Sequence, residues 1–167
     1  RYRFDRYKSD AKAEGPRILL TGDVKAIGPA LAEAQAVAMV RDLVNTPAED
    51  MGPADLEAAA EKLGHAHKAE LRVTRGDALE HGFPMVHRVG RAAARSHAPR
   101  MIELEWGDPA HPRVAIVGKG VCFDSGGLDI KPSASMALMK KDMGGGANVL
   151  GLAETMAQLG LTRDISL

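Results

Sequence analysis

The chain has 167 residues, 45% of them hydrophobic and 26% charged, so it is long enough for one domain with a hydrophobic core. Lys plus Arg equals Asp plus Glu, 22 each, and this balance argues against a nucleic-acid binder, which needs a basic excess. No run approaches the roughly 18 apolar residues of a membrane span, and residues 1–7 are unlike a signal peptide. The single cysteine, Cys122, cannot form an internal disulfide, which favours the reducing cytoplasm.

We expect the chain to be part of a longer protein. It lacks an initiator methionine, and residues 163–167 resemble the start of a strand. Residues 1–16 mix charged and aromatic side chains and end at Gly15-Pro16, which is typical of a linker from a preceding N-terminal domain. Residues 17–167 are then expected to form one partial catalytic domain.

Hydrophobic spacing predicts two helices in the first half of the chain, over residues 29–44 and 53–63. Pro53 at the first helical position and Gly64 after the last support the second helix and predict that it stops there. Short apolar runs predict strands at residues 17–21 and 71–74.

The second half predicts a short helix near residues 77–81, strands at 85–89 and 101–106, and a long helix from 144–146 to 160. The apolar run Val114–Val117 is expected to be a strand buried on both faces. Alternating strands and helices predict an α/β fold, with a mixed, largely parallel sheet flanked by helices. Sites in such folds lie beyond the carboxyl ends of strands, where the loop after Val117 begins.

That glycine-rich loop carries Lys119, Asp124, Lys131 and Asp142 among its charged residues. Carboxylate oxygens bind hard or borderline cations. A dication beside Lys119 would favour its neutral amine, which could then ligate the metal. A charged Lys131 could stabilise a developing oxyanion. This set is typical of half of a two-metal hydrolase site.

Each of these residues also has a purely structural interpretation. Asp124 could cap its own turn, Asp142 could be the N-cap of the following helix, Lys119 could pair with Asp124, and Lys131 could be a solvated surface residue. The same loop offers two weak candidate nucleophiles. Ser125 lacks the Gly-x-Ser-x-Gly pattern, and a buried Cys122 would be inert.

Two stretches of the loop carry a resemblance. Residues 118–132 read Gly-Lys-Gly-Val-Cys-Phe-Asp-Ser-Gly-Gly-Leu-Asp-Ile-Lys-Pro, and residues 138–146 read Leu-Met-Lys-Lys-Asp-Met-Gly-Gly-Gly. Together they closely resemble the leucyl aminopeptidase family of cytosolic two-metal exopeptidases. Residues 41–47, Arg-Asp-Leu-Val-Asn-Thr-Pro, and residues 2–5, Tyr-Arg-Phe-Asp, extend the resemblance upstream.

The resemblance implies a role for each residue. Lys119 and Asp142 would ligate the more loosely held metal, and Asp124 would bridge both metals. Lys131 would be the catalytic lysine that polarises the scissile carbonyl. Met139 would line the pocket for the substrate's first side chain. The family uses two divalent ions, Zn²⁺, Mn²⁺ or Mg²⁺, acts on peptides and usually forms homo-hexamers.

The chain departs from the family at two small residues, Cys122 in place of threonine and Gly146 in place of alanine. It also lacks the family's second motif, Asn-Thr-Asp-Ala-Glu-Gly-Arg, which supplies two further ligands and an arginine. We expect that motif downstream of Leu167, and we expect the 167-residue chain alone to be inactive. The alternatives are a non-catalytic assembly or DNA-binding protein with a degenerate site, and a two-metal phosphohydrolase.

Overall fold

The computed structural model describes residues 2–12, 15–18 and 20–161. Its elements follow one another as α1 (Ile27–Asn45), α2 (Pro53–His67), β1 (Glu70–Thr74), α3 (Gly76–Gly82), α4 (Pro84–Gly90), η1 (Arg95–His97), β2 (Met101–Glu105), α5 (Ser133–Ala137), η2 (Met139–Met143) and α6 (Gly144–Gln158).

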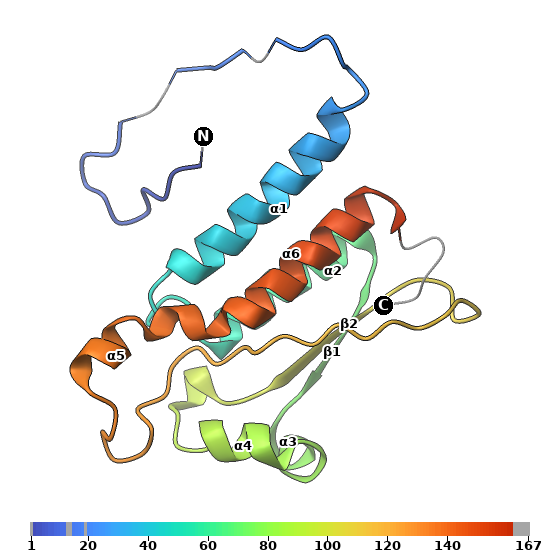
Figure 1. The fold of residues 1–167 in the computed structure, drawn as a ribbon. Helices are drawn as coiled ribbons and strands as arrows, with labels where there is room; N and C mark the ends of the chain where they lie inside the picture. The colour runs from blue at the N-terminus through green and yellow to red at the C-terminus, as the bar shows by residue number, and fades with distance from the viewer. Residues whose placement is uncertain (1, 13–14, 19, 162–167) are drawn as a thin grey trace.

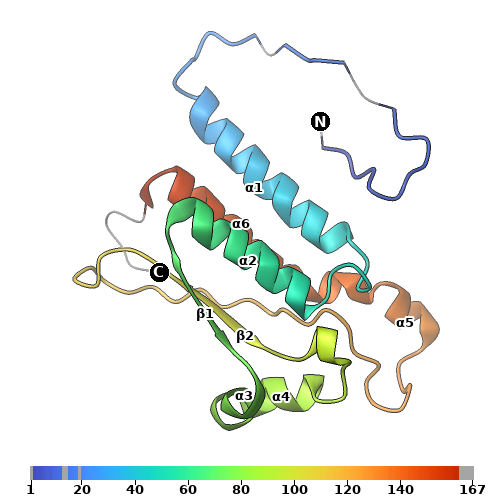
Figure 2. The ribbon, with the colours of Figure 1, turned by 180° about the vertical axis from the view of Figure 1, so that it is seen from behind.

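Three long helices pack beside a two-stranded ribbon. Helix α6 contacts α1 on one side and α2 on the other, and α2 contacts both β1 and β2 (Figures 1 and 2). Small residues let α1 and α6 approach closely. A Cβ built on Gly151 would lie only 2.3 Å from the Cγ2 of Val40. Helices α1 and α6 lie within two residues of the bounds expected from hydrophobic spacing.

The hydrophobic core lies between α1, α2 and α6, and it includes residues of the loop that precedes α6. Cys122 from that loop and Met143 from η2 belong to the core cluster, and Met143 is 1% exposed. The other buried members of the cluster are Leu43, Met51, Leu56, Ala60, Leu63, Ala147, Leu150 and Ala153. Burial of Cys122 and Met143 anchors the loop that carries the candidate site.

The strands β1 and β2 pair antiparallel, from Glu70 opposite Glu105 to Thr74 opposite Met101. The strands expected at residues 71–74 and 101–106 are confirmed within a residue, and helices and strands are mixed as an α/β fold requires. The strand pairing in the described part of the chain is antiparallel, whereas the expected sheet is largely parallel.

Four expectations about the helices and strands are wrong. Residues 85–89 form helix α4 and not a strand, because Pro84 occupies the first helical position, where its fixed φ favours a helix. Helix α2 does not stop at Gly64 but continues to His67, and Lys68 takes the left-handed conformation that ends it (φ 59°). Gly64 is buried against β2, where an added Cβ would lie 3.2 Å from Leu104.

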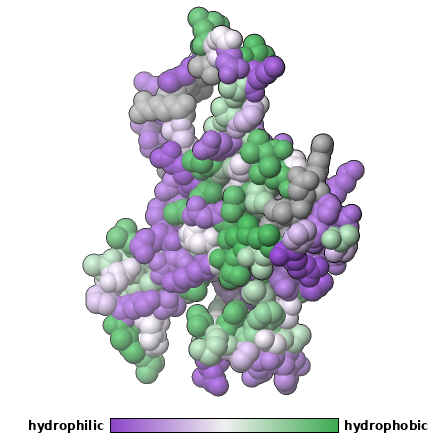
Figure 3. Space-filling view, turned by 45° about the vertical axis from the view of Figure 1, so that its right-hand side comes forward, coloured by the Kyte–Doolittle hydropathy of each residue, from purple (hydrophilic) through white to green (hydrophobic). Residues whose placement is uncertain are grey.

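The third wrong expectation is the strand at Val114–Val117. The segment pairs with no strand among the described residues, and Val117 is 84% exposed. A strand needs a neighbour for its backbone hydrogen bonds, so an apolar run alone does not form one. Apolar residues do reach the surface on the face shown in Figure 3, where they lie among charged ones.

At the N-terminal side, residues 17, 18, 20 and 21 are exposed and in no strand, so the strand expected there is also wrong; residue 19 lies outside the described residues. The apolar run at residues 163–167 lies outside them as well. None of the helices in the described part of the chain has the length and hydrophobicity needed to span a bilayer.

The backbone at Lys119 lies against the first turn of α6. The Lys119 carbonyl accepts a hydrogen bond from the amide of Gly146 (2.8 Å). A Cβ on Gly118 would lie 2.4 Å from the Gly145 carbonyl oxygen, and a Cβ on Gly145 would lie 2.7 Å from the Lys119 amide nitrogen. Only glycine at both positions permits this approach, and the approach fixes the position of the Lys119 backbone relative to α6.

We expect Gly145→Ala to lower stability by about 1–3 kcal/mol relative to Gly144→Ala, because its methyl group would push Lys119 away from α6. The two variants gain the same helix propensity, yet an added Cβ at Gly144 meets only Val44, at 3.8 Å. Urea denaturation of both variants measures the difference. Equal midpoints would show that the close approach is not required.

Candidate metal centre

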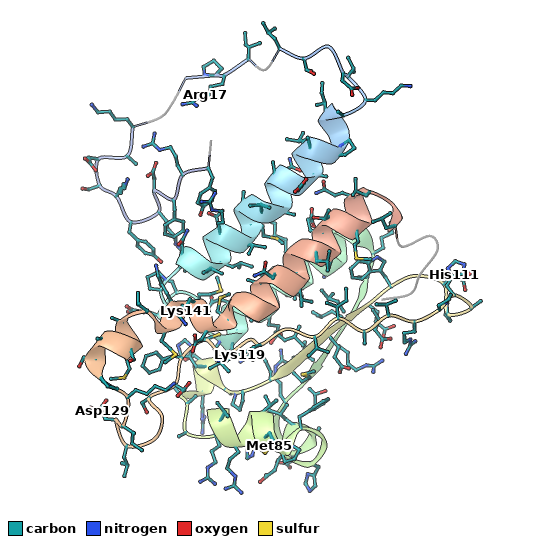
Figure 4. All side chains as sticks on the ribbon, in the orientation of Figure 1. Arg17, Met85, His111, Lys119, Asp129 and Lys141 are labelled. Atoms are coloured by element: carbon teal, nitrogen blue, oxygen red, sulfur yellow. The ribbon has the colours of Figure 1, made fainter. Side chains whose placement is uncertain are left out.

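The four candidate residues come from three neighbouring segments. Lys119 follows the apolar run at residues 114–117, Asp124 and Lys131 lie in the loop that leads to α5, and Asp142 lies in η2. Figure 4 shows Lys119 near the junction of η2 with α6, close to Lys141 of η2, whereas Asp129 lies at the far tip of the loop. The structure therefore brings Lys119 to the turn that carries Asp142.

Asp142 is held by two ammonium groups. Lys141 Nζ lies 2.8 Å from its Oδ1, and Lys119 Nζ lies 3.6 Å from its Oδ2. Lys141 first, and then Lys119, keep the pKa of Asp142 below its ordinary value, against a smaller opposing effect of burial. The N-cap position of α6 is Met143, which makes no side-chain capping bond. The interpretation of Asp142 as a helix cap is therefore wrong.

Asp124 sits at the start of a tight turn. Its Oδ1 accepts hydrogen bonds from the Gly126 amide (2.9 Å) and from Lys131 Nζ (2.6 Å). The turn interpretation of Asp124 is thus confirmed, and the interpretation of Lys131 as a free surface residue is wrong. Both bonds use Oδ1 of Asp124, so they do not prevent a ligand from binding to Oδ2.

The turn itself brings Lys131 back to Asp124. The Lys131 amide donates to the Ser125 carbonyl (3.0 Å), and the Ile130 amide donates to the Gly127 carbonyl (2.9 Å). Gly126 and Gly127 have φ of 78° and 94°, values that favour glycine over residues with a side chain. The double glycine of the motif is therefore a structural requirement of the Asp124–Lys131 pair.

Lys119 acts on both carboxylates. The Lys131 ammonium is the main cause that lowers the pKa of Asp124; burial opposes it, and the Lys119 charge is a further lowering effect. Lys119 also lowers the pKa of Asp142. Lys119 pairs directly with Asp142 and only influences Asp124 at longer range, so the expected Lys119–Asp124 ion pair is wrong.

This donor set fits a divalent cation in part. Two carboxylates and a nitrogen donor are suitable ligands for Zn²⁺, and the carboxylates suit Mn²⁺ and Mg²⁺. Within the described residues, no group of three or more His, Cys, Asp and Glu side chains could hold a metal ion. Lys119, Asp124 and Asp142 would therefore be part of a ligand set and not all of it.

Two further residues of the site were not singled out from the sequence. Lys141 pairs directly with Asp142, and Lys140 reaches away from the site to the carbonyl of Asn45 (3.1 Å). Their position immediately before Asp142 in the sequence could have indicated that they lie near the site. Met139, expected to line a substrate pocket, is 5% exposed, and its contact with substrate stays a prediction.

Neither candidate nucleophile has the environment of one. Cys122 is buried, and burial raises the pKa of its thiol to about 11, with a smaller contribution from Asp55. A thiol with such a pKa is almost fully protonated at neutral pH. Among the described residues, no hydrogen bond joins the Ser125 hydroxyl to a histidine that could act as a base. The structure therefore supports neither Cys122 nor Ser125 as a nucleophile.

Comparison with known proteins identifies the family. The model of the cytosol aminopeptidase family, catalytic domain, matches residues 38–167. A probable cytosol aminopeptidase from Rhodococcus opacus is 36% identical over 181 aligned residues, which cover 99% of this chain and 35% of that protein. The chain belongs to the cytosol aminopeptidase family.

Solved structures agree. The cytosol aminopeptidase from Coxiella burnetii matches with a TM-score of 0.78 and 44% identity, over 86% of this chain and 31% of that chain. The bottromycin maturation enzyme BotP in complex with Mn matches with a TM-score of 0.83 and 37% identity, over 99% and 35%. The family resemblance and the α/β fold are thus confirmed. The chain spans about a third of the length of these relatives.

Replacing Lys131 with methionine should raise the pKa of Asp124 toward the ordinary aspartate value, because the main positive neighbour is lost. A depressed pKa in the folded state means that the pair stabilises the fold above the ordinary pKa and ceases to do so as the pH falls through the depressed value. Carboxyl ¹³C NMR titration measures the shift. The matched variant Lys141→Met should raise the pKa of Asp142 and leave that of Asp124 unchanged.

Cys122 should react with iodoacetamide at pH 8 roughly a hundredfold more slowly than an exposed cysteine, because its thiol is buried and its pKa is raised to about 11. Mass spectrometry over time measures the rate, and the chain unfolded in urea serves as the control. Equal rates for folded and unfolded chains would contradict the buried, protonated thiol.

Proposed function

We propose that this chain is the metal-binding part of a metal-dependent aminopeptidase that removes leucine-like N-terminal residues from peptides. The observation that carries the proposal is the position of the Lys119 ammonium, 3.6 Å from the Asp142 carboxylate and near enough to Asp124 to lower the pKa of that carboxyl. A positive charge thus already balances Asp142, as a bound metal ion would. Family membership supports the reaction class.

The proposed cofactors are two divalent ions, Zn²⁺, Mn²⁺ or Mg²⁺. Lys119 and Asp142 would hold one ion, and Asp124 would bridge it to the other. Such ions supply an activated water and anchor the substrate's amine and carbonyl. The Mn reported with the related BotP supports a divalent metal in this family.

In this proposal Lys119 changes role when metal binds. With a metal ion bound, the Lys119 amine, which lies 3.6 Å from Asp142 and is 61% exposed, could serve as a ligand in place of the ammonium. Metal binding should therefore release protons and strengthen as the pH rises. Lys131, whose Nζ lies 2.6 Å from the Asp124 carboxylate, could stabilise the oxyanion of the transition state.

Substrate choice and assembly are further parts of the proposal. Met139, next to the ligand-bearing turn, would contact the first side chain of the substrate and favour apolar residues such as leucine. The cytoplasm and a homo-hexamer are proposed on the resemblance to the family. Peptides are the proposed substrates, and neither a membrane nor nucleic acid is a proposed partner.

A chimaera tests the proposal on this chain's own residues. Residues 38–167 replace the matching segment of the Coxiella burnetii cytosol aminopeptidase, to which the chain is 44% identical. We expect the chimaera to hydrolyse leucine p-nitroanilide in Mn²⁺ and to lose activity in a chelator. Asp124→Asn and Asp142→Asn should each lower kcat about a hundredfold or more, since a charged metal ligand is lost.

Two controls accompany the chimaera. Asp129→Asn removes a carboxylate from the same loop but at its far tip, so it should leave kcat within about twofold. The isolated 167-residue chain should show no activity above a metal-free control, because it lacks the family's second motif. Full activity of Asp142→Asn, or of the isolated chain, would contradict the proposed roles.

The same chimaera separates the alternatives. A two-metal phosphohydrolase would cleave p-nitrophenyl phosphate and spare the leucine anilide. A DNA-binding protein with a degenerate site would cleave neither and would shift DNA in a gel at physiological salt. Cleavage of the anilide alone is the result that the aminopeptidase proposal expects.

A further inference from the structure

The turn that carries Asp142 is attached to the end of a helix far away in the sequence. Lys140 Nζ donates a hydrogen bond to the main-chain carbonyl of Asn45, the last residue of α1 (3.1 Å). Lys140 and Asn45 are 95 positions apart. Lys140 is half-buried, whereas Lys141 beside it is exposed. The two adjacent lysines of η2 therefore face different surroundings.

The end of α1 is a site that attracts a cation. Carbonyl groups at a helix C-terminus lack partners within the helix and carry partial negative charge. The last turn of α1 contains no basic residue of its own, and it contains Asp42. Lys140 of η2 thus supplies from another element the positive charge that this helix end lacks.

The end of α1 is also held by a residue of the N-terminal segment. Tyr2 donates a hydrogen bond to Asp42 (2.6 Å) and accepts one from the Asn45 amide group (3.3 Å), and Arg41 stacks on the Tyr2 ring. Thr46, 3% exposed, bonds back to the Asp42 carbonyl through its hydroxyl (2.7 Å). The Asn45 carbonyl is therefore a fixed point against which another segment can be positioned.

Within η2, some side chains anchor the turn and others face the candidate site. Met139 and Met143 are buried at 5% and 1% exposure. Lys140 binds the end of α1, and Lys141 and Asp142 face each other and Lys119. The position of the Asp142 carboxylate therefore depends on two buried methionines and one ion–carbonyl bond.

We propose that Lys140 is a positioning residue: its ammonium joins η2 to the C-terminal end of α1 and thereby holds Asp142 beside Lys119. The part that concerns metal rests on the proposed function, whereas the attachment itself does not. Lys140 touches neither carboxylate of the candidate site in the described contacts, so its effect on the site is indirect.

The test compares Lys140→Met, which removes the charge, with Lys140→Arg, which keeps it, in the 167-residue chain. Lys25→Met is the matched control, because Lys25 is exposed and lies before α1. Chains labelled with ¹³C-methyl methionine report on η2 through Met139 and Met143 and on the remote strand β2 through Met101. Titration with Mn²⁺ alone, followed by line broadening, gives metal affinity.

We expect Lys140→Met to shift or broaden the Met139 and Met143 signals, to leave Met101 in place, and to weaken Mn²⁺ binding about tenfold. Lys140→Arg and Lys25→Met should keep the wild-type signals and bind Mn²⁺ within about twofold. A merely destabilising substitution would move Met101 as well, and arginine would not restore the pattern.

Unchanged Met139 and Met143 signals in a folded Lys140→Met chain would overturn the inference. If the methionine variant fails to fold, the arginine variant decides: wild-type methyl signals support the attachment, and displaced ones overturn it. If the wild-type chain does not bind Mn²⁺, its partial ligand set is not sufficient to hold the ion, and the methyl signals alone decide whether Lys140 attaches η2 to α1.

Discussion

The candidate site depends on the contact between the backbone at Lys119 and the first turn of α6. Two glycines, Gly118 and Gly145, let these segments approach to distances that any side chain would prevent. The Lys119 carbonyl then takes the place of a side-chain cap by accepting the Gly146 amide. Because that cap comes from the backbone, the Asp142 carboxylate is not needed at the helix end and is available to a ligand.

Charge provides the second constraint. In the described loop, Lys131 pairs with Asp124, while Lys119 and Lys141 pair with Asp142. Exposed ion pairs contribute little to stability, so this arrangement is not explained by folding energy alone. If the proposed metal ions bind here, the lysines are the counter-ions that balance the two carboxylates in the metal-free chain.

Much of this could be read from the sequence because the information is local. Helices α1, α2 and α6 follow from hydrophobic spacing, and the glycine-rich loop places its four candidate residues within 24 positions, from Lys119 to Asp142. The wrong expectations have different causes. Pro84 starts a helix at residues 85–89, whereas residues 114–117 are an apolar run with no partner strand among the described residues, and apolar spacing alone does not encode a partner.

The contacts that set the geometry of the site are the ones that local patterns miss. Lys140 and Asn45 are 95 positions apart in the sequence, and Tyr2 and Asp42 are 40 positions apart. Both contacts meet at the C-terminal turn of α1, whose Asn-Thr-Pro end contributes a carbonyl and a buried threonine and no ligand. The motif that resembles the family at residues 41–47 thus has a physical role: it forms the fixed end against which the ligand-bearing turn is placed. Substitutions there would move the turn that carries Asp142 without contacting the candidate site directly, so residues outside the site constrain its geometry.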